Sequence, residues 1–304
     1  MMSISPVNSL QLSHHVLAIR NSDQSLEFYL KVIGMALLGT YTCEDKTHYF
    51  LGFDSASEDN SRLPDYPHCV LELVFDPQRA PILNQSEGGS LPGYWKLALA
   101  VVDVELARST LMQQGIHVSE AVQVPDVAYL CHLEDPDGYC IELIQHRMQD
   151  NHAPSAPDDN YALASATTLS LVTCRIKDPR PSLDFYQREL GMRLISRQQV
   201  AHRGFTLYFL SCDQEAPPST DVDNIEMREW LWQRPYALLE LQHIWGTELQ
   251  TDFSYPIGAD TGFEKIRLLA SGWSGERSRD PCFDCESAEL VDADGYRIQL
   301  LLVD

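Results

Sequence analysis

The sequence is poor in basic residues. It has 22 Lys and Arg against 44 Asp and Glu, a formal net charge of -22. A nucleic-acid backbone or an anionic membrane surface would repel such a chain, so we expect neither as a partner. No apolar run approaches the length of a membrane-spanning helix. The N-terminus also lacks a basic stretch followed by an apolar one, so we expect no secretory signal and a cytoplasmic location.

Cysteine patterns with a clear chemical meaning are scarce. Most of the 8 cysteines lie singly within apolar strand patterns, as Cys69, Cys140 and Cys174 do. A free cysteine in that setting behaves as a small hydrophobic residue, which suits a reducing compartment. Cys282 and Cys285 form one C-x-x-C. With no second pair and no thioredoxin-like βαβ context, this spacing predicts neither a zinc site nor a redox motif.

A long internal repeat is the strongest feature that is present. Residues 14–20 (HHVLAIR), 25–29 (SLEFY) and 33–35 (IGM) recur at constant spacing as 171–177 (LVTCRIK), 182–186 (SLDFY) and 190–192 (LGM). Such a repeat indicates two copies of one folding unit. Each copy has the pattern of a strand, a short amphipathic helix and a glycine turn into a second strand.

The repeat extends through the rest of each half. Residues 70–73 (VLEL) correspond to 238–241 (LLEL), and 135–139 (DPDGY) to 292–296 (DADGY). We therefore predict a first module over residues 1–146, a linker rich in Pro, Asp, Asn and Ser over 147–166, and a second module over 167–304. In the last unit a Gly- and Ser-rich stretch, 271–280, stands where a helix is expected.

The motifs of the second half resemble the vicinal oxygen chelate superfamily, and within it glyoxalase I, the lactoylglutathione lyase family. They are RIKDPxxSLDFYxxxLGM, LYFL at 207–210, LELxHxWGTE at 239–248 and DADGY. The resemblance covers nearly the whole chain. It implies an α+β fold of two tandem modules, each with two βαβββ units forming a curved mixed sheet. The shortened last unit would leave its outer face bare or covered by a second copy, so a homodimer stays open.

The resemblance also implies where chemistry would occur. Glyoxalase I isomerises a glutathione hemithioacetal with a divalent metal, and a ligating glutamate moves the proton. Carried over residue by residue, the four ligand positions of the two modules fall on His14 and Leu171, Glu72 and Glu240, Lys96 and Lys265, and Glu142 and Gln299. A site could combine units within one module or between modules, and no pairing supplies four ligands. A metal would keep His14, Glu72 and Gln299; Glu72, Glu142 and Glu240 are the candidate catalytic carboxylates.

Lysine stands at the position that the family gives to histidine. An ammonium has no lone pair for a metal, and deprotonating it at pH 7 costs roughly 4–5 kcal/mol. A lysine aimed at two buried carboxylates would instead supply the positive charge they need. We therefore predict that Lys96 and Lys265 lie within salt-bridge reach of the glutamates. The alternative is that each lysine points outward and covers a sheet edge with its stem.

The contacts that the family makes with glutathione are depleted. Arg175 keeps the arginine of the RIKD strand, but Ala18 stands there in the first module, and Ile244 and Thr261 replace two further polar contacts. The candidate substrate-binding residues are Arg175, Lys96, Lys265 and His132. The ordinary alternatives are a surface salt bridge for Arg175, and for His132, as for His48, a histidine whose hydrogen bonds are satisfied within a strand.

Three functions remain to be weighed. The first is a metal-independent member that binds a small molecule in a cavity between strands or has an altered activity, with no cofactor. The second is an active lactoylglutathione lyase with one Zn²⁺ or Ni²⁺ site. The third, an extradiol dioxygenase, requires two histidines and a glutamate around iron, and the ligand positions hold only His14.

Overall fold

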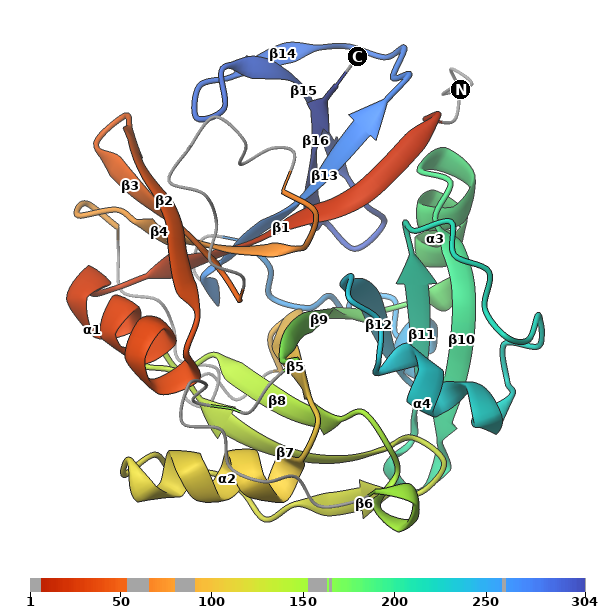
Figure 1. Cartoon of the computed structure of the whole chain (residues 1–304). Helices are drawn as coiled ribbons and strands as arrows, with labels where there is room; N and C mark the ends of the chain where they lie inside the picture. Colours follow the sequence, from red (N-terminus) through yellow and green to blue (C-terminus); the bar gives the residue numbers. More distant parts are fainter. Residues whose placement is uncertain are drawn as a thin grey trace.

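The computed structural model describes residues 7–53, 66–79, 91–152, 163, 166–258 and 261–303, which form two eight-stranded mixed sheets (Figure 1). In spatial order, sheet A contains β14 (Ser278–Asp280), β15 (Cys285–Val291), β16 (Arg297–Leu302), β13 (Phe263–Ser271), β1 (Ser9–Ile19), β4 (Val70–Phe75), β3 (Lys46–Gly52) and β2 (Ala36–Cys43). Sheet B contains β10 (Arg193–Val200), β11 (Phe205–Ser211), β12 (Leu238–Ile244), β9 (Thr168–Ile176), β5 (Tyr94–Val101), β8 (Cys140–Gln145), β7 (Ala128–Glu134) and β6 (Val122–Val124).

Each sheet combines one unit from each half of the chain. β1 pairs antiparallel with β13 in sheet A, and β5 pairs antiparallel with β9 in sheet B. The predicted two-module α+β fold is confirmed, and of the two pairings left open by the sequence the structure has the one between modules. The proposed linker, 147–166, lies largely outside the described residues, so its boundaries stay a prediction.

Three of the four units carry a helix between their first two strands. These are α1 (Ser22–Glu27) continued by the π-helix η1 (Phe28–Ile33), α2 (Val104–Gln113), and α3 (Pro179–Asp184) continued by η4 (Phe185–Glu189). Their N-cap side chains, Asn21, Asp103 and Asp178, each accept a first-turn backbone N–H. In the described chain no helix lies between β13 and β14, as the shortened sequence of this unit predicts.

The repeated SLxFY and DxDGY motifs bind one another. The Tyr29 hydroxyl donates to Asp135 Oδ2 at 2.8 Å, and the Ser25 hydroxyl donates to Asp137 Oδ2 at 2.8 Å. The second module repeats both contacts with Tyr186 and Asp292, and with Ser182 and Asp294. Each pair of hydrogen bonds joins the helix that follows a strand of one sheet to a loop of the other sheet. The repeated motifs therefore link the two sheets at two places.

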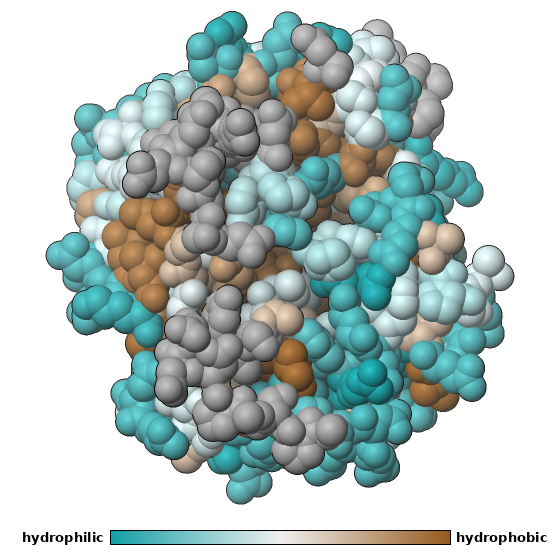
Figure 2. All heavy atoms as spheres, viewed as in Figure 1, coloured by the Kyte–Doolittle hydropathy of each residue, from teal (hydrophilic) through white to brown (hydrophobic). Residues whose placement is uncertain are grey.

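The described residues contain no helix long and apolar enough to cross a membrane. On the face shown in Figure 2 hydrophilic residues predominate, in keeping with the large excess of acidic residues. Hydrophobic residues gather mainly at the left of this view.

Candidate functional site

In sheet B a lysine lies between two buried glutamates. Lys96 Nζ is 2.5 Å from Glu142 Oε1 and 3.3 Å from Glu240 Oε2. Thr173 Oγ1 donates to Glu240 Oε2 at 2.5 Å, and His132 Nε2 is 3.1 Å from Glu142 Oε2. The contacts predicted for Lys96 are therefore present, and His132 belongs to the same cluster.

The charges in this cluster balance unevenly. Burial works against the ammonium, but the two carboxylates outweigh it and raise the pKa of Lys96. Burial would also raise the pKa of Glu142, yet the nearby Lys96 prevails and lowers that pKa to about 2. At Glu240 burial prevails over Lys96, and the pKa is raised. One ammonium thus balances one of the two carboxylates.

The cavity beside this cluster is almost filled by side chains. Its volume is about 40 Å³, which is room for one or two water molecules. Trp232 packs edge-on against Phe209 with ring centroids 5.4 Å apart, and its Nε1 donates to Val127 O. Arg175 stacks over Trp95 and bonds Gln242 and the carbonyl of Pro92, outside the residues that line the cavity. Sheet B therefore offers a small, largely apolar cavity with the charged cluster at one wall.

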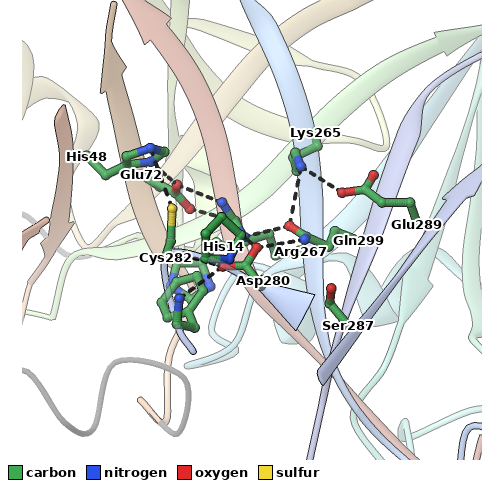
Figure 3. A network of polar contacts seen from close by, with 12 residues as sticks. His14, His48, Glu72, Lys265, Arg267, Asp280, Cys282, Ser287, Glu289 and Gln299 are labelled. Carbon is green, nitrogen blue, oxygen red and sulfur yellow. Dashed lines mark hydrogen bonds and ion pairs between the residues drawn. The ribbon is translucent and has the colours of Figure 1, made fainter. Parts of the chain in front are cut away.

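In sheet A an arginine occupies the centre (Figure 3). Arg267 Nε forms an ion pair with Glu72 Oε2 at 2.9 Å, and its Nη2 donates to Glu72 Oε1 at 3.1 Å. Its Nη1 donates to Asp280 Oδ2 at 2.8 Å and to Gln299 Oε1 at 2.5 Å. Burial alone would raise the pKa of Glu72, but Arg267 and His48 lower it to about 2.

The prediction for Lys265 was wrong in its partners. Its ammonium lies 2.8 Å from Glu289 Oε1 and 3.3 Å from Gln299 Oε1, toward the rim, where the Glu289 side chain is 37% exposed. Arg267 lies two residues from Lys265 on the same face of β13, and it is the side chain that pairs with Glu72. The corresponding position of β5 is Ala98, which leaves Lys96 room to enter the centre of sheet B.

His14 is placed near this centre but is held as a neutral ring. Burial lowers its pKa to about 4, an effect only partly offset by Glu72. Its Nδ1 is 3.1 Å from Ser13 Oγ, and its ring packs against Phe50 and Phe283. His14 therefore serves the described structure as a core residue beside the charged cluster.

Four site residues were missed from the sequence: Arg267, Asp280, His48 and Cys282. Strand alternation could have found Arg267, because a residue two positions from Lys265 must share its face. The sequence pattern favours an ordinary strand histidine at His48, but its Nδ1 lies 2.8 Å from Glu72 Oε1. Asp280 ends the helix-free stretch 271–280 and Cys282 follows it, and the family pattern gives no guide to this region.

The sheet A cavity is much larger than that of sheet B. Its volume is about 340 Å³, within the range of small-molecule sites. Charged and polar side chains supply most of its lining, among them Lys46, His48, Lys265, Arg267, Asp280, Cys282, Glu289 and Gln299. This is the cavity of the two that a small polar molecule could occupy without displacing an aromatic side chain.

The depressed pKa of Glu72 predicts a pH-dependent mutational effect. A carboxylate with a folded pKa of about 2 and an ordinary value of 4.5 contributes about 3 kcal/mol of stability at neutral pH. This contribution is complete above about pH 4.5 and is lost as the pH falls through 2. Glu72→Gln should therefore cost about 3 kcal/mol at pH 7 in urea unfolding and less than half of that at pH 3.

The exposed Glu286, paired with Arg277, supplies the control. Glu286→Gln should change the unfolding free energy by less than about 1 kcal/mol at both pH values. An equal cost of Glu72→Gln at pH 7 and pH 3 would contradict the assignment of an ionised, arginine-bound carboxylate.

A divalent metal does not fit either centre. A protein cation already lies between the acidic groups, Lys96 in sheet B and Arg267 in sheet A. Neither cation can donate a lone pair to a metal. Over the described ranges, no three or more His, Cys, Asp or Glu side chains are arranged to hold one.

Comparisons with known proteins agree with this fold. The profile of the Glyoxalase/Bleomycin resistance protein/Dioxygenase superfamily matches residues 11–143. The chain is 30% identical over 264 residues to "Glyoxalase I" of Saccharomyces cerevisiae, covering 82% of this chain and 74% of the relative. It is 28% identical over 272 residues to "Lactoylglutathione lyase" of Schizosaccharomyces pombe, covering 87% and 82%. The crystal structure of glyoxalase I from Zea mays superposes with a TM-score of 0.65 at 21% identity, covering 96% of this chain and 92% of that one.

Proposed function

Because the chain belongs to the Glyoxalase/Bleomycin resistance protein/Dioxygenase superfamily, we propose that it is a divergent, glyoxalase I-like member that works without a divalent metal. Its ligand is a small polar molecule bound in the sheet A cavity. Sheet B serves as a packed structural core.

One observation carries the proposal: an amino-acid cation occupies the middle of both acidic clusters. Arg267 neutralises Glu72 and Asp280, and Lys96 neutralises Glu142. A metal ion entering either cluster would have to displace a buried cation from hydrogen-bonded carboxylates, which is costly. The sheet A cavity suits a polar ligand because the charged side chains of Lys46, Lys265 and Glu289 line it.

The test combines elemental analysis with an activity assay. The purified protein should hold no stoichiometric Zn²⁺ or Ni²⁺, and neither ion should raise its melting temperature. Conversion of the methylglyoxal–glutathione hemithioacetal should be absent even with added metal. Loss of a metal Lewis acid removes several kcal/mol of transition-state stabilisation, about a thousandfold or more in rate.

Lys96→His is the positive control. It removes the ammonium and adds an imidazole beside Glu142, Glu240 and His132, so added Zn²⁺ should raise the melting temperature of this variant alone. Tight metal binding by the unmodified protein would overturn the proposal.

The alternative function is an active lactoylglutathione lyase with one divalent-metal site. The names and extensive similarity of the two yeast relatives favour it. It predicts a strict dependence of hemithioacetal turnover on Zn²⁺ or Ni²⁺ and loss of activity on chelation. The same assay therefore separates the two functions.

A further inference from the structure

Three side chains distant in the sequence lie side by side in sheet A (Figure 3), and two of them, Cys282 and His48, line the cavity. Cys282 Sγ, in the turn between β14 and β15, is 3.6 Å from His48 Nε2 on β3. His48 Nδ1 is in turn 2.8 Å from Glu72 Oε1 on β4. A thiol, an imidazole and a carboxylate in this order are the parts of a nucleophile, its base and the group that orients the base.

The surroundings fix which imidazole nitrogen carries the proton. Arg267 binds both oxygens of the fully buried Glu72 and keeps this group ionised. An ionised carboxylate can only accept, so Nδ1 of His48 must donate to it. In the neutral ring the other nitrogen, Nε2, then presents its lone pair to Cys282. This is the tautomer that a general base requires.

Cys282 rests as a thiol in this site. Burial, together with the nearby Asp280, raises its pKa to about 12. A cysteine in this state depends on a base to take its proton as it attacks. His48 Nε2 is the base within reach, so the cysteine and the histidine are useful only together.

The turn that carries Cys282 is held from both halves of the chain. Asp280 Oδ1 accepts the backbone N–H groups of Cys282 and Phe283, and the Tyr41 hydroxyl on β2 donates to the Pro281 carbonyl. Phe283 also stacks over the Arg267 guanidinium at 5.0 Å. Cys282 is partly exposed and belongs to the lining of the cavity.

The fold itself does not demand this arrangement, as sheet B shows. The register of β3 with β4 and of β11 with β12 makes Leu207 the counterpart of His48. The turn between β6 and β7 spans residues 125–127, which contain no cysteine. The triad is therefore a property of the sheet A site alone.

We propose that Cys282 is a catalytic nucleophile, with His48 as its general base and Glu72 as a positioning residue, and that the site acts on small esters or thioesters. The thiol sulfur bonds to the acyl carbon as its proton passes to His48 Nε2. The tetrahedral adduct collapses, and the departing alcohol or thiol takes that proton from His48. Water then attacks the acyl-cysteine with His48 again accepting a proton, which releases the carboxylic acid and restores the thiol.

The test uses limiting p-nitrophenyl acetate on the full chain. It follows release of p-nitrophenolate and locates the acetyl group by peptide mass spectrometry. We expect a burst of product with acetylation at Cys282. Cys282→Ala and Cys282→Ser should both abolish the burst. His48→Gln should slow acylation about a hundredfold or more.

Cys285→Ala is the matched control, because Cys285 belongs to the same C-x-x-C but is absent from the cavity lining, and it should leave the burst unchanged. Glu72→Gln should change the pH profile of acylation, which a purely structural residue would not do. Equal acetylation of Cys282 and Cys285, or an unchanged rate in His48→Gln, would overturn the inference.

This inference rests on the proposed function only in placing the ligand in the sheet A cavity, and the two fail separately. Metal-dependent lyase activity would overturn the proposed function while leaving acylation of Cys282 intact. An unreactive Cys282 would overturn this inference while leaving metal-free binding intact.

Discussion

Lys96→Ala should lower the unfolding free energy by about 3–5 kcal/mol, the cost of stranding a buried charge whose partner has been removed. Lys96 is 2% exposed and is the cation that contacts both Glu142 and Glu240. Without it the two carboxylates would face one another, and one must take up a proton or unfold the site. Equilibrium unfolding in urea at pH 7 measures the loss directly.

Lys265→Ala is the matched control, because Lys265 occupies the corresponding position of sheet A. Its partner Glu289 is 37% exposed, so this variant should lose less than about 1 kcal/mol. Adding Glu142→Gln to Lys96→Ala should restore part of the lost stability, since the added change removes one of the stranded charges. A loss below 1 kcal/mol in Lys96→Ala itself would show that the lysine does not stabilise the cluster.

Arg267→Met should be as damaging, again by about 3–5 kcal/mol, because it strands Glu72 and Asp280 together. The guanidinium bonds both carboxylates and Gln299, and methionine fills a similar volume without any donor. The loss should shrink as the pH falls toward 3, because protonation relieves the stranded carboxylates.

Arg279→Met tests whether that loss is special to the buried site. Arg279 lies on β14, next to Asp280, and pairs with Asp284, but both side chains are largely exposed, so the cost should stay under about 1 kcal/mol. Similar unfolding free energies for Arg267→Met and Arg279→Met would refute the central role given to Arg267.

Most of the fold could be predicted because apolar alternation marks the strands of each repeat and turn residues mark where they end. The SLxFY and DxDGY motifs mark the helix and the loop that lock together through Tyr29 and Asp135. The pairing of units between modules could not be read from the same pattern. The first strands of the four units are largely buried along their length, so their sequences do not identify their neighbours.

The residues of the candidate site could be predicted at the positions that match the family pattern, but not at the positions that differ from it. Lys96 lies with Glu142 and Glu240 in sheet B and Glu72 lies in sheet A, which is one of the two pairings that the sequence leaves open. Which cation reaches which carboxylate depends on side-chain volume at neighbouring positions, as the contrast of Arg267 with Ala98 shows. Cys282 reaches His48 through a turn whose path no strand period specifies.

The pairing of units between modules also bears on symmetry. Two identical subunits related by a twofold axis carry every substitution twice, so both of their sites must change together. In this chain each sheet is assembled from two unlike segments, and a change in one sheet leaves the other untouched. The cavity of sheet B beside Trp232 is about 40 Å³, whereas the cavity of sheet A beside Arg267 is about 340 Å³. Because a single chain carries both sheets, the two can differ in cavity size and in charge, which two identical subunits cannot do.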